Sequence, residues 1–111
     1  MDDCVFCNIV KRQIQSDILH ETDSLIVIRD IMPKAPVHLL VVPKLHIPSI
    51  TNVEQSHQEL MGELIVVAKQ IAQKQKIDES GYKLIFNVGR DGGQVIPHVH
   101  LHILGGKLMA E

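Results

Sequence analysis

Three histidines occupy every second position near the C-terminal end of the chain, at His98, His100 and His102. Successive side chains of a β-strand point to opposite faces, so this spacing predicts three imidazoles on one face and apolar side chains on the other. Histidine titrates near pH ~6.5, so a neutral imidazole is available at pH 7 as a nucleophile or as a proton donor. The segment is therefore the first candidate for a catalytic site.

Three interpretations of this segment are open from the residues alone. A polar, solvent-facing strand could use histidine without any chemistry. Two imidazoles on one face could chelate a catalytic metal ion. A neutral imidazole could instead form a covalent intermediate. The glycine-rich residues 89–93 could be a plain hairpin loop, but beside three histidines they favour a pocket whose backbone N–H groups approach a phosphate or an oxyanion.

A second candidate for chemistry is the pair Cys4 and Cys7, which are separated by two residues. This separation allows two thiolates to bind one metal ion. It is also compatible with two buried thiols, or with a redox pair, although no βαβ pattern adjoins it. The residues alone do not choose among the three.

The composition limits the classes of protein that can contain these residues. With 111 residues, of which 45% are apolar, we expect one domain over residues 1–111. A net charge of −2 excludes a basic nucleic-acid-binding stripe, and no membrane contact is expected, because the longest apolar run, residues 64–68, is far shorter than the ~18 residues needed to span a bilayer. The N-terminus shows no secretory signal, so we expect the cytoplasm and reduced cysteines.

Hydrophobic periodicity predicts the elements that must position these residues. A short helix is expected within residues 5–13, and strands at 18–20, 25–28, 37–42, 82–88 and 98–104. Thr51 and Glu54 predict a capping box at the start of a long helix. Its apolar stripe is Leu60, Leu64, Val67, Ala68 and Ile71, broadened by Met61, Ile65 and Ala72. Short connections favour an α+β fold with antiparallel strands.

The segment His98-Val99-His100-Leu101-His102-Ile103-Leu104-Gly105-Gly106 resembles the signature of the histidine triad (HIT) family, and its ending is similar to that of the Hint branch, the purine nucleoside phosphoramidases. Further residues fall where that branch would place them: Phe6, Ile9, Asp30, Ile31, Pro33, Ala35, Pro36, His38, Pro43, Lys44, Asn87, Asp91, Gly92, Gly93 and Gln94. The resemblance implies a five-stranded antiparallel sheet with one long and one short helix. It also implies a homodimer in which two such sheets join.

The resemblance also implies a reaction and the residues that perform it. His100 would attack the α-phosphorus of a purine nucleotide and form a covalent nucleotidyl-imidazole. His102 would pass a proton to the leaving group, and His38 would stand behind His102. The chemistry agrees, because an amine that leaves from phosphorus must be protonated. A nucleoside monophosphate such as AMP would be released.

The resemblance assigns nucleotide-binding roles to a further group of residues. Asp30 would accept hydrogen bonds from the ribose hydroxyls, and Asn87 with the backbone of Gly93, Gln94 and Val95 would hold the phosphate and the leaving group. An apolar slot for the purine would be lined by Val5, Phe6, Ile9, Ile28 and Ile31. Val95 stands where the branch usually has a hydroxyl residue, so a side-chain hydrogen bond to the leaving group would be absent. The chain also ends soon after Gly106, where the branch often has a longer tail that shapes substrate choice.

Many microbial HIT proteins carry a structural zinc ion on two cysteines and two histidines, and the matching residues here are Cys4, Cys7, His46 and His98. Such a closed site would contribute folding free energy and would leave the chemistry to His100. His20 and His57 are expected to be exposed and without a role.

Three other functions remain open beside a nucleoside phosphoramidase. A dinucleoside polyphosphate hydrolase is the nearest within the family, and the Gly105-Gly106 ending argues against it. A nucleotidyltransferase is disfavoured, because that branch has Gln where this chain has His102. A nucleotide-binding or scaffold module would keep the histidines without turnover.

Overall fold

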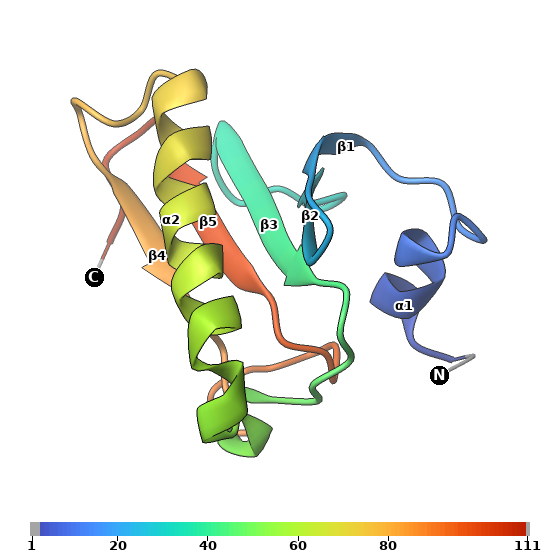
Figure 1. The fold of residues 1–111 in the computed structure, drawn as a ribbon. Coiled ribbons are helices and arrows are strands. Elements are labelled where there is room, and N and C mark those ends of the chain that lie inside the picture. The colour runs from blue at the N-terminus through green and yellow to red at the C-terminus, as the bar shows by residue number, and fades with distance from the viewer. Residues whose placement is uncertain (1–2, 111) are drawn as a thin grey trace.

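The computed structural model describes residues 3–110, which form one antiparallel sheet with the strand order β1-β2-β3-β5-β4 (Figure 1). The strands are β1 (Ile18–Glu21), β2 (Leu25–Arg29), β3 (Val37–Pro43), β4 (Tyr82–Ile85) and β5 (Leu101–Gly105). A short helix, α1 (Val5–Val10), precedes them, and a long helix, α2 (Gln58–Lys74), lies between β3 and β4 in the sequence. The predicted α+β class, with five strands, one long helix and one short helix, is confirmed.

The two helices cover opposite faces of the sheet, as the alternation of apolar residues requires. Odd-numbered residues of β2 and β3 share a buried cluster with α2, and even-numbered residues share another with α1. The first set is Leu25, Val27, Leu39 and Val41, and the second is Ile26, Ile28, Leu40 and Val42. Figure 1 shows α2 lying along the β5 and β3 part of the sheet and α1 beyond its β2 and β1 part.

The start of α2 differs from the prediction that Thr51 caps it. Thr51 lies in a 3-10 turn (Ile50–Asn52), and the chain returns to an extended conformation at Val53 before a second turn (Gln55–His57) leads into α2. A capping box caps this second turn instead, formed by Glu54 and His57, and the Glu54 N–H donates to His57 Nδ1 at 2.9 Å. His57, which was expected to be exposed, is partly buried and forms this structural contact.

The predicted apolar stripe of α2 is confirmed for Leu64, Val67, Ala68, Ile71 and Ala72, which are buried. Leu60 and Met61 are partly buried against the same cluster. Ile65 is 50% exposed, so the second row predicted on this helix is wrong at that position. Over residues 3–110, none of the helices is both long and apolar enough to span a bilayer.

Strand β5 begins at Leu101, three residues later than predicted, and β4 ends at Ile85 rather than at Val88. The late start of β5 follows from the hydrogen bonds of the residues before it. The Val99 N–H donates to the Ile47 carbonyl in the loop after β3, at 2.7 Å, and the His98 N–H donates to Ile96. The alternation nevertheless continues through the segment, because Val99, Leu101 and Ile103 all join the cluster with α2.

Candidate active site and metal centre

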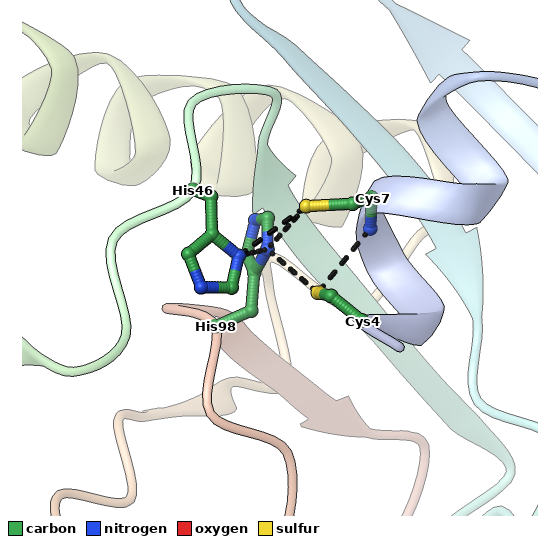
Figure 2. Close-up of side chains that lie close together, drawn as sticks. All are labelled: Cys4, Cys7, His46 and His98. Carbon is green, nitrogen blue, oxygen red and sulfur yellow. Dashed lines mark hydrogen bonds between the residues drawn. The ribbon is translucent and has the colours of Figure 1, made fainter. Parts of the chain in front are cut away.

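Four side chains from distant parts of the sequence meet beside α1 (Figure 2). Cys4 and Cys7 belong to the start of α1, His46 to the loop after β3, and His98 to the segment before β5. Cys4 Sγ lies 3.3 Å from His98 Nδ1, and Cys7 Sγ lies 3.3 Å from His46 Nδ1 and 3.6 Å from His98 Nδ1. The two Nδ1 atoms are 3.1 Å apart. The structure thus brings together all four predicted metal ligands.

These separations fit one tetrahedral zinc ion. With Zn–S near ~2.3 Å and Zn–N near ~2.0 Å, tetrahedral geometry separates sulfur from nitrogen by about 3.5 Å and two nitrogens by about 3.3 Å. Cys4 and Cys7 are buried, free thiols, and His98 is fully buried. Thiolate sulfur and imidazole nitrogen are the donors that zinc prefers in closed structural sites.

The tautomer of His98 also fits a metal ligand. Its Nε2 lies 2.8 Å from the Pro43 carbonyl oxygen, which can only accept, so Nε2 carries the proton. Burial lowers the pKa of His98 to about 4, so the ring is neutral at pH 7 and its lone pair is on Nδ1, the atom that faces the two thiols. A hydrogen bond from the far nitrogen to a carbonyl is the usual support of a metal-binding histidine.

The same argument fixes the tautomer of His100. Its Nδ1 lies 2.7 Å from the His98 carbonyl oxygen, so Nδ1 donates and Nε2 carries the lone pair. Burial lowers the pKa of His100, which keeps the ring neutral at pH 7. A neutral imidazole with a bare Nε2 is the form that a nucleophile needs.

His38 and His102 form a chain of hydrogen bonds beside it. The Lys34 N–H donates to His38 Nδ1 at 3.0 Å, so the proton of neutral His38 is on Nε2. That Nε2–H lies 2.9 Å from His102 Nδ1 and donates to it, which leaves the His102 proton on its own Nε2. Burial lowers the pKa of both rings, that of His102 to about 4, with neighbouring His100 and His38 adding to the effect. The His100 and His102 rings have centroids 5.0 Å apart.

Asp30 adds a carboxylate to this chain. Its Oδ2 lies 3.3 Å from His38 Nε2, and its Oδ1 accepts from the Met32 N–H at 2.8 Å. Asp30, His38 and His102 are close enough to share a metal ion by distance. The tautomers argue against one, because His38 has its Nδ1 lone pair engaged by Lys34 and its proton on Nε2.

In the glycine-rich turn predicted to bind phosphate, several backbone N–H groups already form hydrogen bonds within the turn. The Gly93 N–H donates to Arg90 and the Gln94 N–H donates to Gly89, while Asn87 Nδ2 donates to the Gly92 carbonyl at 2.9 Å. The Gln94 amide donates to the Pro48 and Ile96 carbonyls, which fixes the turn against the loop after β3. A nucleotide that uses these groups must therefore share or replace bonds within the turn.

The residues predicted to line an apolar slot differ widely in exposure. Phe6, Ile9 and Ile28 lie in the buried cluster under α1, and Val5 is partly buried at its edge. Ile31, in the loop between β2 and β3, is 92% exposed, and Val95 is 88% exposed. A slot that included all five apolar residues would extend from this cluster to the open surface of that loop.

Several functional groups of the site could not be found from residue types. The Pro43 and His98 carbonyls and the Lys34 N–H set the tautomers of three histidines. All three are backbone groups, so the type of residue that carries them gives no signal in the sequence. The contact of Phe6 with the histidine segment was also not predicted. Its ring meets the rings of His98 and His100 edge-on, at centroid distances of 5.6 and 5.0 Å.

Comparison with known proteins places this arrangement in a class. The family model described as "Scavenger mRNA decapping enzyme C-term binding" matches residues 3–111. The chain is 42% identical over 106 residues to the purine nucleoside phosphoramidase of Escherichia coli K12, which covers 96% of this chain and 89% of that protein. A crystal structure of a HIT family hydrolase from Legionella pneumophila matches with a TM-score of 0.96 at 42% identity, over 97% of this chain and 96% of that one.

A zinc-bound histidine triad family protein from Mycobacterium smegmatis is also similar, with a TM-score of 0.81 at 27% identity, over 96% of this chain and 76% of that one. The chain therefore belongs to the histidine triad family, as the resemblance implied. It is a hydrolase of the HIT type, with the HIT fold.

Proposed function

We propose that this hydrolase cleaves purine nucleoside phosphoramidates, or related acylated nucleotides, and releases a nucleoside monophosphate through a covalent nucleotidyl-histidine. The observation that carries the proposal is the pair of tautomers at the start of β5. His100 presents a bare Nε2, and His102 beside it presents an Nε2–H, so one group can attack phosphorus while the other protonates what leaves. The E. coli relative named above supports this substrate class.

The proposed steps balance in protons and electron pairs. His100 Nε2 attacks the α-phosphorus, the P–N bond breaks, and its electron pair goes to the departing nitrogen. His102 gives that nitrogen its Nε2 proton, and the hydrogen bond from His38 Nε2–H to His102 Nδ1 stabilises the negative charge that develops on the His102 ring. Water then attacks the phosphorus of the intermediate and gives one proton to His102 Nε2, and the phosphorus–imidazole bond breaks with its electron pair returning to Nε2 of neutral His100.

The positive charge that develops on His100 has two sources of stabilisation in this site. Its Nδ1–H points to the His98 carbonyl oxygen, and the Asp30 carboxylate raises the pKa of the ring against the larger effect of burial. Both interactions are present before the substrate binds, so they need no reorganisation during the reaction.

We assign the nucleotide-binding roles as follows. Asp30 accepts hydrogen bonds from the ribose, while Asn87, Gly93, Gln94 and Val95 contact the phosphate and the leaving group. Val5, Phe6, Ile9, Ile28 and Ile31 line the purine slot. Since Asp30 also faces His38, the ribose and the hydrogen-bond chain of His38 and His102 would share the Asp30 carboxylate.

We further propose that Cys4, Cys7, His46 and His98 hold one structural zinc ion. All four ligand atoms lie within 4.8 Å of one another, which supports a closed site with no position for substrate. The metal would connect α1 to the segment before β5 and contribute free energy of folding. It would take no part in the bond-breaking steps.

We also propose that residues 1–111 form one HIT domain and that two copies pair. Strand β4 is at an edge of the sheet, where unpaired backbone groups can bond to a second chain. Two free cysteines at a metal site suit a reducing compartment, which supports the cytoplasm.

Incubation of the purified protein with adenosine 5′-phosphoramidate tests the function. We expect release of AMP and, after acid-free quenching, a protein mass increased by one adenylyl group in a peptide that contains His100. Parallel reactions with an acyl-adenylate and a dinucleoside polyphosphate rank the leaving groups. Tight binding of AMP without turnover of any of the three would show a nucleotide-binding module instead.

A further inference from the structure

We propose that the metal centre positions the nucleophile, with His98 and Phe6 acting as positioning residues for His100. The catalytic consequence rests on the function proposed above, but the positioning itself is a property of the free protein. Three contacts in series carry the inference, and each lies in a buried part of the site.

The first contact fixes His98. Its side chain is fully buried, its Nδ1 faces the sulfur atoms of Cys4 and Cys7, and its Nε2–H donates to the Pro43 carbonyl. A ligand held at both ring nitrogens cannot rotate without breaking a bond to one of them. The peptide unit that carries the His98 carbonyl is therefore held by the metal centre on one side.

The second contact passes from that carbonyl to the catalytic ring. The His98 oxygen accepts from His100 Nδ1 at 2.7 Å, and this bond selects the tautomer whose Nε2 is bare. If the carbonyl turns away, the proton can move to Nε2, and a ring protonated there cannot attack phosphorus. The state of the metal centre thus sets the fraction of His100 that is a nucleophile.

The third contact runs through α1. Phe6 lies between the two cysteines in the sequence, it is 2% exposed, and its ring touches the rings of both His98 and His100. A metal ion bound by Cys4 and Cys7 fixes the first turn of α1 against His98, and so holds Phe6 against the side of His100. Loss of the metal would release α1, and with it this support.

The test compares the zinc-loaded protein with the same protein after removal of zinc by a chelator. With histidine labelled by nitrogen-15, long-range proton–nitrogen spectra report the tautomer of His100. We expect one Nδ1–H tautomer with zinc and a mixture without it. In the same samples, the single-turnover rate constant at saturating phosphoramidate should fall about 10²-fold, while the Kd of AMP changes by less than threefold. An unchanged tautomer and rate in folded, zinc-free protein would overturn the proposal.

A second variant decides the matter if the zinc-free protein unfolds. Phe6→Leu leaves all four metal ligands in place but removes the aromatic edge from His100. With one zinc ion per chain by elemental analysis, this variant should show a mixed His100 tautomer and a slower first step. The matched control is Ile26→Val, in the same buried cluster, which should keep the wild-type tautomer and rate. Equal spectra and rates for the two variants would contradict the role of Phe6.

The spectra separate this inference from the proposed function. They need no substrate, so the tautomer can depend on zinc even if no phosphoramidate is hydrolysed, and then only the proposed function fails. If wild-type protein is active and its His100 tautomer ignores zinc, only the positioning inference fails.

Discussion

At the scale of single residues, the site is defined by where three protons lie. His38, His100 and His102 each have one ring nitrogen fixed by a neighbour, and two of those neighbours are backbone groups. Burial keeps all three rings neutral by lowering their pKa values. The histidine spacing in the sequence predicted which side chains meet, but the proposed division into nucleophile and proton donor depends on backbone geometry.

His100→Ala tests the role of the nucleophile. We expect loss of turnover to the uncatalysed level, because the variant has no group to attack phosphorus, with AMP affinity within about tenfold, or about 1.4 kcal/mol, of wild type. Single-turnover assays and calorimetric titration with AMP measure the two effects. His20→Ala, at a histidine in β1 away from the site, is the control and should retain full activity. Near-normal turnover in the His100 variant would exclude the covalent route.

The low pKa of His102 has a consequence for stability. Since its pKa is about 4 in the folded protein and near 6.5 otherwise, the unfolded chain binds a proton at this residue first as the pH falls. The contribution of His102 to the free energy of unfolding is therefore present above pH ~6.5 and is lost as the pH falls toward about 4.

Urea denaturation at pH 7 and pH 5 measures this effect. The wild-type protein should lose more free energy of unfolding between the two pH values than His102→Gln, which has no ring to protonate. His20→Gln is the matched variant and should follow the wild type. An equal loss in wild type and His102→Gln would mean that His102 is as easily protonated in the folded protein as in the unfolded chain.

At the scale of elements, the short helix α1 carries two of the four proposed metal ligands, Cys4 and Cys7. Six residues are too few for a stable isolated helix, so its position must come from its contacts. These are the apolar cluster formed with β2 and β3 and the four-ligand centre formed with His46 and His98. The apolar cluster therefore keeps this segment on the sheet, and the proposed metal ion would add to its stability.

Cys4→Ser tests the metal contribution. The variant replaces a thiolate ligand with a hydroxyl, so zinc content and Tm should fall together. Elemental analysis and thermal melting, with and without added chelator, measure both. Ser24→Ala, which removes a hydroxyl outside the centre, is the control and should bind zinc as wild type does. If native protein contains no zinc, the metal proposal is wrong.

The start of α2 provides a direct contrast between sequence and structure. Because the structure places the capping box at Glu54 and His57, His57→Ala should lower the free energy of unfolding by about 1 kcal/mol. Thr51→Ala should change it by less than about 0.5 kcal/mol, because Thr51 does not cap α2. Chemical denaturation of both variants measures the difference. A larger loss of free energy of unfolding for Thr51→Ala than for His57→Ala would support the cap at Thr51 that the sequence predicted.

These contrasts show what the sequence could and could not predict. Strand positions, the stripe on α2 and the meeting of seven site side chains followed from periodicity, from residue type and from the resemblance to a family. Element boundaries did not follow, because the extended conformation of Val53 and the Val99–Ile47 hydrogen bond depend on long-range packing. The tautomers and the contact of Phe6 did not either, because they depend on distances between segments that are remote in the sequence.

At the scale of the whole molecule, strand β4 at the edge of the sheet exposes an apolar side chain, and a single chain does not account for this exposure. Leu84 in β4 is opposite Ile103 in β5, so both side chains point to the α2 side of the sheet, yet Leu84 is 38% exposed. Ile65 and Val66 on α2 are more exposed still. An exposed apolar side chain such as Leu84 on an open strand edge is suited to pairing with a second copy.

Leu84→Glu tests this pairing. A charge buried between two copies without a partner is strongly unfavourable, so the variant should sediment as a monomer of 12.4 kDa while wild type sediments at twice that mass. Ile14→Glu, at an isoleucine of similar exposure remote from β4, is the matched control and should remain dimeric. If the wild-type protein sediments at the mass of one chain at micromolar concentration, the edge of β4 is not an interface between copies, and the exposed Leu84 needs another explanation.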